Sequence, residues 1–422
     1  MKFEEHQRID ARIVESAKNI KVLSRLSWPA GVMETFLAGW RSGKPELPVI
    51  EYAKSDDLSE SARGLDRAID SLKSLDDPLA DFLRNTAESY LVLCDLLMHV
   101  GKPDVLNFSR GLYGAPGDVL SEGSVTNLEA AQYFLKQSAQ FSEATHLHEA
   151  DYSVPAEVVK SELEKRLADV FPGRTVGVVI DPNLASKATA GATRIRLRGD
   201  TCFSDYEIEQ LLHHEAFVHS LTALNGRAQP IIRSLGLGAP RTTGPQEGLA
   251  TFAELVTGSI DIGRMQRIAL RVVGIDRALS GANFIDVFEF FLDAGQSENE
   301  SFSSAMRIFR GAPVTGGAAF TKDVVYLHGL MEVHTFFRWA LQHQRLELCR
   351  YFFAGRMTIA DACKLAPMFE DGILAGPRYL PTWMTRTNGL AGYLAFSIFA
   401  NRISIEALDE HHRFERVQEI SI

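Results

Sequence analysis

The sequence has few cysteines, no long apolar run and no excess of positive charge. Its four cysteines are scattered through 422 residues without a C-x-x-C pair, which argues against a disulfide framework or a thiolate zinc site. No apolar run approaches the roughly 18 residues of a membrane-spanning helix, and the first residues do not form an apolar secretion signal. The formal charge of −10 argues against nonspecific nucleic-acid binding as the main activity. We therefore expect a cytoplasmic protein with neither a membrane nor a nucleic-acid partner.

One helix is better delimited than any other in the sequence. Ser204 and Glu207 have the spacing of a capping box, in which each side chain satisfies a backbone amide at the start of a helix. The Asn-Gly pair at 225–226 is a typical stop signal. These signals predict a helix over residues 205–224.

This helix carries the pattern H-E-x-x-x-H, one residue longer than the H-E-x-x-H of zinc peptidases. Side chains five residues apart on an α-helix lie about 140° apart, against about 40° for four residues. His214 and His219 can therefore bind one ion only if the helix widens into a π-turn, a feature common at functional sites. His213 is an alternative ligand, although no carboxylate directly follows it. All three histidines also fit an ordinary helix that binds nothing.

The following segment supplies a carboxylate. Pro245 suits the first turn of a second helix, which Gly258 can end, so Glu247 falls in that first turn. Gly248 beside it has no side chain to crowd an ion. Two helical histidines and a glutamate form a ligand set of catalytic zinc sites, which leave the fourth position to water. We therefore expect one Zn²⁺, bound by the two histidines of the H-E-x-x-x-H pattern and by Glu247.

Two further carboxylates have candidate roles beside this ion. Glu215 adjoins a ligand and is our candidate general base, which would take a proton from the zinc-bound water. Glu254 lies seven residues past Glu247, on the same helical face. It can accept a hydrogen bond from a ligating imidazole, but its position also fits an exposed helix carboxylate.

A zinc peptidase also needs a group that stabilises the oxyanion. Tyr326 is our candidate, ahead of His328 and His334, because phenols and imidazoles can donate a hydrogen bond in a dry site. A buried helical tyrosine is equally consistent with a packing role. A carboxypeptidase additionally needs a cation for the terminal carboxylate of its substrate. Arg310 and Lys322 flank a glycine-containing loop and are our candidates.

Strand signals are concentrated between residues 174 and 198. Residues 175–180 read as a buried strand, and residues 194–198 alternate strictly between arginine and aliphatic side chains. We expect the second strand to lie at a sheet edge, where an extended substrate can pair with it. Arg194 and Arg196 on its polar face are candidates for attracting an acidic peptide tail, although a solvated strand face explains them as well.

The rest of the chain has helical periodicity, so the predicted fold class is α+β and mainly α-helical. We expect a zincin-like metallopeptidase core with a small antiparallel or mixed sheet. The expected organisation is a helical N-terminal subdomain over residues 1–150, a metal-binding catalytic core over 151–260, and a helical C-terminal subdomain over 261–422 that completes the cleft.

Residues 246–250 read QEGLA, and together with the H-E-x-x-x-H pattern they resemble the bacterial flavohaemoglobin expression-modulating QEGLA-motif proteins. The eukaryotic relatives of that family are the microtubule-associated tyrosine carboxypeptidases. The resemblance extends from about residue 30 to about residue 400. Further segments that fit it are 95–97, 112–116, 225–226, 310–311, 316–317 and 320–326. The resemblance implies a zinc metallopeptidase fold.

We therefore expect a zinc-dependent peptidase of carboxypeptidase type that acts on a peptide or protein C-terminus. One alternative is a regulatory or binding protein that keeps the metal fold without turnover. Glu215 argues against it, because a purely structural site needs no base beside its ligand. Another alternative is a zinc hydrolase of a small amide, which the sequence separates poorly from a peptidase. No motif identifies the substrate or the oligomeric state.

Overall fold

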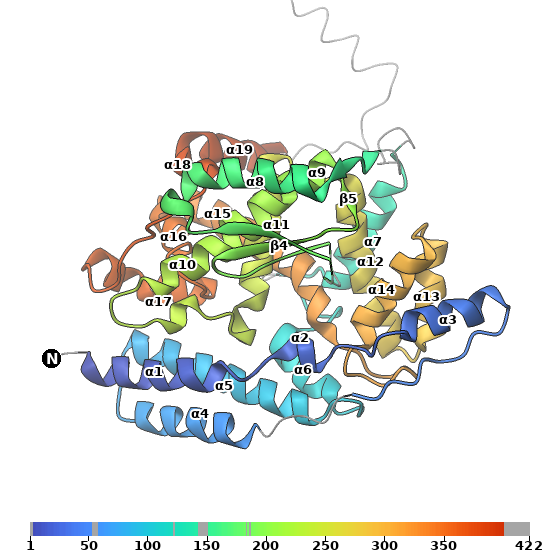
Figure 1. Cartoon of the computed structure of the whole chain (residues 1–422). Coiled ribbons are helices and arrows are strands. Elements are labelled where there is room, and N and C mark those ends of the chain that lie inside the picture. The colour runs from blue at the N-terminus through green and yellow to red at the C-terminus, as the bar shows by residue number, and fades with distance from the viewer. Residues whose placement is uncertain are drawn as a thin grey trace, which may run out of the picture.

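The computed structural model describes residues 3–52, 58–120, 123–141, 151–182, 184 and 187–400. It shows a mainly helical protein with two small sheets, which confirms the predicted α+β class (Figure 1). The main hydrophobic core takes buried side chains from the N-terminal, central and C-terminal parts of the chain, among them Leu83, Leu249 and Phe337. No helix in the described ranges combines the length and apolarity that a bilayer crossing requires.

The N-terminal part is helical, as predicted. Its helices are α1 (Glu4–Ala17), α2 (Val22–Arg25), α3 (Val32–Arg41), α4 (Ser59–Leu72), α5 (Pro78–Met98), α6 (Val105–Tyr113) and α7 (Asn127–Ser138). Asp77 begins α5, because its carboxylate accepts hydrogen bonds from the backbone amides of Leu79 and Ala80, at 2.9 and 3.1 Å. Helices α1, α4 and α5 pack against one another (Figure 1).

The central part holds the strands. Its elements are β1 (Val154–Pro155), α8 (Ala156–Val170), η3 (Pro172–Arg174), β2 (Gly177–Asp181), β3 (Ala188–Ala190), β4 (Arg194–Arg198) and β5 (Cys202–Phe203). Strands β1 and β5 form an antiparallel pair. The other three strands form a mixed sheet of order β2-β4-β3, in which β4 is parallel to β2 and antiparallel to β3.

The arginine-bearing strand β4 was predicted at a sheet edge, and this prediction is wrong. Strand β4 is the central strand, because Ile195 and Leu197 on its other face are fully buried and both of its backbone edges are paired. Arg194 and Arg196 are exposed, as the alternation predicted. The edges of this sheet are β2 and β3, and β3 packs against the helix that carries the histidines.

Two helical runs follow. The first consists of α9 (Asp205–Gln210), η4 (Leu211–Ser220) and α10 (Leu221–Arg227), and it leads through the short turns η5 (Ser234–Gly236) and η6 (Pro240–Thr242) to α11 (Thr243–Thr257). The C-terminal part contains α12 (Ile262–Leu279), α13 (Phe284–Asp293), α14 (Glu298–Phe309), η7 (Thr321–Val324), α15 (Val325–Gln342), α16 (Leu346–Tyr351), α17 (Ile359–Glu370), α18 (Thr382–Thr385) and α19 (Thr387–Ala400). Helices α11 and α15 pack along each other near the middle of the molecule (Figure 1).

The Asn-Gly pair at 225–226 does not end its helix, which continues to Arg227. The Asn225 amide instead donates to the backbone carbonyls of Phe353 and Tyr379, at 2.8 and 2.9 Å. A Cβ atom at Gly226 would lie 2.5 Å from the backbone nitrogen of Gly236. The pair therefore fastens two distant chain segments to the helix rather than stopping it.

Helices α3, α13 and α14 enclose an aromatic cluster of Phe36, Phe284, Phe288 and Phe302. The Phe36 ring centroid lies 5.1, 5.0 and 5.5 Å from those of the other three rings. All four side chains are buried. The interior of this cluster is held by apolar contact and by edge-to-face or tilted ring packing.

Candidate metal centre

The helix that carries the histidines is widened, as the spacing of its residues predicted. Ser204 and Glu207 form the capping box at its start, and the helix then becomes a π-helix over Leu211–Ser220. A π-helix brings residues five apart onto one side, because its hydrogen bonds join residues i and i+5. The imidazoles of His214 and His219 therefore lie next to each other, edge to face, with ring centroids 4.8 Å apart and an interplanar angle of 82°. The prediction of a single π-turn underestimated the length of this segment.

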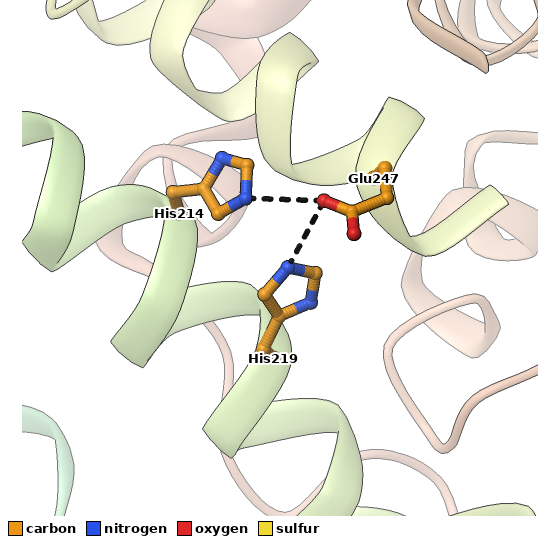
Figure 2. Close-up of side chains that lie close together, drawn as sticks. All are labelled: His214, His219 and Glu247. Atoms are coloured by element: carbon orange, nitrogen blue, oxygen red, sulfur yellow. Dashed lines mark ion pairs between the residues drawn. The ribbon is translucent and has the colours of Figure 1, made fainter. Parts of the chain in front are cut away.

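Helix α11 brings Glu247 to the two imidazoles. One Glu247 oxygen, Oε2, lies 3.3 Å from His214 Nε2 and 3.6 Å from His219 Nε2. Figure 2 shows both ring nitrogens directed at this oxygen. One ligand atom from each residue lies within 4.8 Å of the others, close enough to hold one metal ion. We call His214, His219 and Glu247 the His–Glu cluster.

Glu254 lies behind His214, where the helical spacing placed it. Its Oε1 is 2.6 Å from His214 Nδ1, so the opposite ring nitrogen is free to face Glu247. Glu254 is fully buried, and Arg264 donates two hydrogen bonds to its oxygens, at 3.2 and 3.1 Å. Although burial opposes ionisation, the Arg264 charge and the His214 hydrogen bond lower the pKa of Glu254 to about 2. A metal-ligating histidine is typically oriented by such a carboxylate.

The second oxygen of Glu247 has its own partner. Lys322 donates to Oε1 at 3.1 Å, from the short helix η7 that precedes α15. Burial raises the pKa of Glu247, but the Lys322 charge and the two imidazoles lower it well below the usual range. Glu247 is therefore a carboxylate with one oxygen fixed by Lys322 and the other directed at the histidines.

Each residue of the QEGLA segment has a physical role at this site. Gln246 is buried and accepts a hydrogen bond from the Thr222 hydroxyl at 2.8 Å, which ties α11 to the helix of the histidines. Gly248 lies against Gly329 of α15, and a Cβ atom at Gly248 would be 2.6 Å from the Gly329 Cα. Leu249 and Ala250 are fully buried. The segment therefore combines a cluster residue with the contacts that position it.

Gly329 marks a close approach between α15 and α11. A Cβ atom there would lie 2.9 Å from the Gly248 Cα, so the backbones of α11 and α15 touch. Lys322 lies in η7, which continues directly into α15, the helix that contains Gly329. The contact between α11 and α15 therefore sets the position of Glu247 relative to Lys322.

His213 and Glu215, which flank His214 in the sequence, differ in burial and in their contacts. Glu215 is partly exposed, next to His214 in the chain. His213 is buried away from the His–Glu cluster, with its Nε2 3.5 Å from Glu209 and its ring against Phe217. Burial lowers the pKa of His213. The alternative in which His213 replaces His214 in the cluster therefore does not fit the geometry.

Tyr326 lies beside the His–Glu cluster, and two cations lie near its ring. The Lys322 ammonium is 5.6 Å from its ring centroid, and the Arg264 guanidinium carbon is 5.7 Å from it. In the described part of the chain its hydroxyl makes no hydrogen bond, and the side chain is partly exposed. His334, the weaker candidate, instead packs its ring against Phe252, and burial lowers its pKa. His328 is partly exposed on the same helix.

The predicted substrate-binding arginines lie in different places. Arg310 follows α14, and its Nε is buried with no hydrogen-bond partner among the described residues. Arg196 lies 3.8 Å from Asp181 on the exposed face of the sheet. Within the described ranges, neither Arg194 nor Arg196 contacts the His–Glu cluster.

Sequence reasoning missed four arginines: Arg264, described above, and Arg271, Arg307 and Arg356. Arg356 is half-buried and donates to the backbone carbonyl of His219 at 2.9 Å, close to the end of the π-helix. Arg307 binds both oxygens of Asp323, at 2.6 and 2.8 Å, and Arg271 lies 3.7 Å from the same carboxylate. Asp323 follows Lys322 directly, so its place in the family segment 320–326 was the available signal.

The fold and site define a mainly helical α+β protein with a two-histidine, one-glutamate candidate metal centre built on a π-helix and the helix after it. Comparison with protein families then identifies the lineage. The chain belongs to the family described as microtubule-associated tyrosine carboxypeptidase, whose model matches residues 34–402. This confirms the resemblance noted in the sequence and places the chain in a carboxypeptidase-type enzyme family. No individual curated protein matches it.

Proposed function

We propose that this protein is a zinc-dependent carboxypeptidase with a zincin-like core, and that His214, His219 and Glu247 hold the ion. The donor set supports this, because two imidazoles and one carboxylate are ligands of catalytic zinc. The single observation that carries the proposal is the convergence of both ring nitrogens on one Glu247 oxygen, at 3.3 and 3.6 Å (Figure 2). Zinc bound by such a set lowers the pKa of water at its open position.

The side chains around the cluster supply the remaining chemistry. Glu215 accepts the proton of the attacking water and passes it to the leaving amine. Glu254 keeps the proton of His214 on Nδ1, and so keeps the Nε2 lone pair directed at the ion. Lys322 holds Glu247 in its ionised form, and Tyr326 donates its hydroxyl to the oxygen that gains charge when the peptide carbonyl is attacked.

The substrate in this proposal is a peptide or protein with a free C-terminus. The family description names tyrosine, so peptides that end in tyrosine belong at the head of any substrate panel. Arg310 is a candidate for binding the terminal carboxylate, and the exposed Arg194 and Arg196 are candidates for attracting acidic residues of the peptide.

The test combines metal analysis with a peptide panel for wild type and three variants. His214→Ala is expected to lose zinc, and Glu215→Gln is expected to keep zinc while hydrolysis falls at least about 1,000-fold. His213→Ala is the matched control, because it removes a neighbouring histidine outside the cluster and is expected to keep zinc.

The alternatives give different outcomes. Zinc binding without release of any terminal residue would favour a regulatory or binding protein. Hydrolysis of small amides but of no peptide would favour the amide hydrolase. Zinc lost from His213→Ala but retained by His214→Ala would overturn the ligand set.

A further inference from the structure

A second group of charges adjoins the His–Glu cluster, around Tyr326. It contains five cationic side chains, which we call the cation cluster: Arg264, Arg271, Arg307, Arg310 and Lys322. Electrostatic interaction with Tyr326 contributes to the pKa of each. Three carboxylates face these cations, namely Glu247, Glu254 and Asp323. The group therefore carries two more positive than negative charges.

Three of the five cations are hydrogen-bonded to a carboxylate. Arg264 is bound to Glu254, and Lys322 is bound to Glu247. Arg307 donates two short hydrogen bonds to Asp323, in the bidentate geometry that satisfies a carboxylate.

With Arg310, Arg271 is one of the two cations left over. Its closest acidic atom is Asp323 Oδ2 at 3.7 Å, beyond hydrogen-bond distance, and Arg307 already holds both oxygens of that carboxylate. No hydrogen bond of Arg271 is present within the described residues. Its side chain is 17% exposed, so part of it reaches solvent. Burial and the neighbouring Arg307 charge lower the pKa of Arg271 to about 10. A buried, incompletely paired arginine is costly unless a ligand completes it.

The position of Arg271 relates it to the proposed zinc site. Helix α12 carries Arg264 and Arg271 seven residues apart on one face, and Arg264 is already tied to the histidine through Glu254. In η7, which packs against α12, Lys322 contacts Glu247. The next residue, Asp323, lies beside Arg271. Arg271 and the His–Glu cluster are therefore linked through two consecutive residues of one segment, Lys322 and Asp323.

We propose that Arg271 binds the α-carboxylate of the residue that is removed, with Arg310 as a second guanidinium in the same subsite. This rests on the proposed carboxypeptidase function and adds the group that limits cleavage to chain ends. A guanidinium matches a carboxylate because two parallel N–H groups meet its two oxygens. Arg310 suits the second role because its buried Nε has no partner among the described residues.

The test uses paired peptides of one sequence, one with a free C-terminal carboxylate and the other with a C-terminal amide. Their affinities are measured with the zinc-loaded Glu215→Gln protein, in which turnover is blocked, and their hydrolysis with the active protein. Arg271→Gln is expected to lower affinity and kcat/KM for the free acid about 100-fold, with little change for the amide. Arg271→Lys is expected to lose less, because a single ammonium keeps the charge without the fork. Arg277→Gln, on the same helix, is the matched control and is expected to retain the preference.

A structural role for Arg271 would lower the values for both peptides together and leave their ratio unchanged, which would overturn the proposal. Folding of the variants is checked by zinc content and thermal unfolding, and Arg271→Lys provides the ratio if Arg271→Gln does not fold. The two proposals fail in different ways. If wild type releases no residue but still binds the free acid more tightly than the amide through Arg271, the enzyme proposal fails and the subsite stands. If wild type hydrolyses both peptides equally, the subsite fails and the enzyme stands.

Discussion

The aromatic cluster between α3, α13 and α14 and the region around the His–Glu cluster are both buried, yet different forces hold them. In the aromatic cluster, Phe36 packs against three other rings at centroid distances between 5.0 and 5.5 Å. Around Glu247, charged and polar groups pair with specific partners, such as Lys322 on one carboxylate oxygen. Apolar packing depends on volume, whereas the polar region depends on the position of single atoms. The two regions should therefore respond differently to substitution.

The largest stability effect is expected in the aromatic cluster. Phe288→Ala removes a fully buried ring and should lower the free energy of unfolding by about 3–5 kcal/mol. Zinc affinity of the folded variant should not change, because α13 does not contribute to the His–Glu cluster. Denaturant unfolding and a zinc titration check this, and a parallel fall in zinc affinity would show that the two regions are coupled.

Gly329→Ala is expected to act on both properties. Its Cβ atom would lie 2.9 Å from the Gly248 Cα, so α11 and α15 must separate, at a cost of about 3 kcal/mol. The separation moves Glu247 from the histidines, and zinc affinity should fall as well. Gly111→Ala is the control, since nothing lies within 4 Å of its Cβ position. Zinc affinity equal to wild type in Gly329→Ala would refute the role given to this contact.

Glu254→Gln should leave the fold intact and weaken the metal centre. The amide can still accept a hydrogen bond from His214 Nδ1, but the negative charge between His214 and Arg264 is lost. We expect a 10- to 100-fold loss of zinc affinity. Competition with a chromophoric chelator measures it, and an unchanged affinity would show that the carboxylate is structural only.

The smallest expected effect is a difference in pH dependence. Burial disfavours the Asp323 carboxylate, but Arg307 and Arg271 hold its pKa well below 3.8. A depressed pKa means that Asp323 adds stability above 3.8, which is lost as the pH falls below that value, by up to about 1.4 kcal/mol per pH unit. In chelator, Phe288→Ala should show the same slope between pH 5 and 3 as wild type, and Asp323→Asn a shallower one. Equal slopes for all three proteins would show that Asp323 does not contribute to the pH dependence of stability.

The local elements of the site could be predicted from the sequence, because their signals are local. The capping box at Ser204, the fifth-residue spacing of the histidines and the glycine at 329 each have a short-range physical meaning. The central position of β4 could not, because strand order depends on partners elsewhere in the chain. The proposed role of Arg271 could not be predicted from the sequence either. It follows from the fact that Arg307 occupies both oxygens of Asp323 and leaves Arg271 without a hydrogen bond to that carboxylate.

The ten-residue π-helix has a consequence for any attempt to convert this centre into the shorter H-E-x-x-H form. Removing one residue between the histidines would align them on a normal α-helix, but every later residue of the helix would turn by about 100°. Asn225, which holds the carbonyls of Phe353 and Tyr379, would then face elsewhere. The extra residue therefore sets the rotation at which the helix meets the C-terminal half of the molecule. Deleting a single residue here should destabilise the fold more than it disturbs the arrangement of the two histidines.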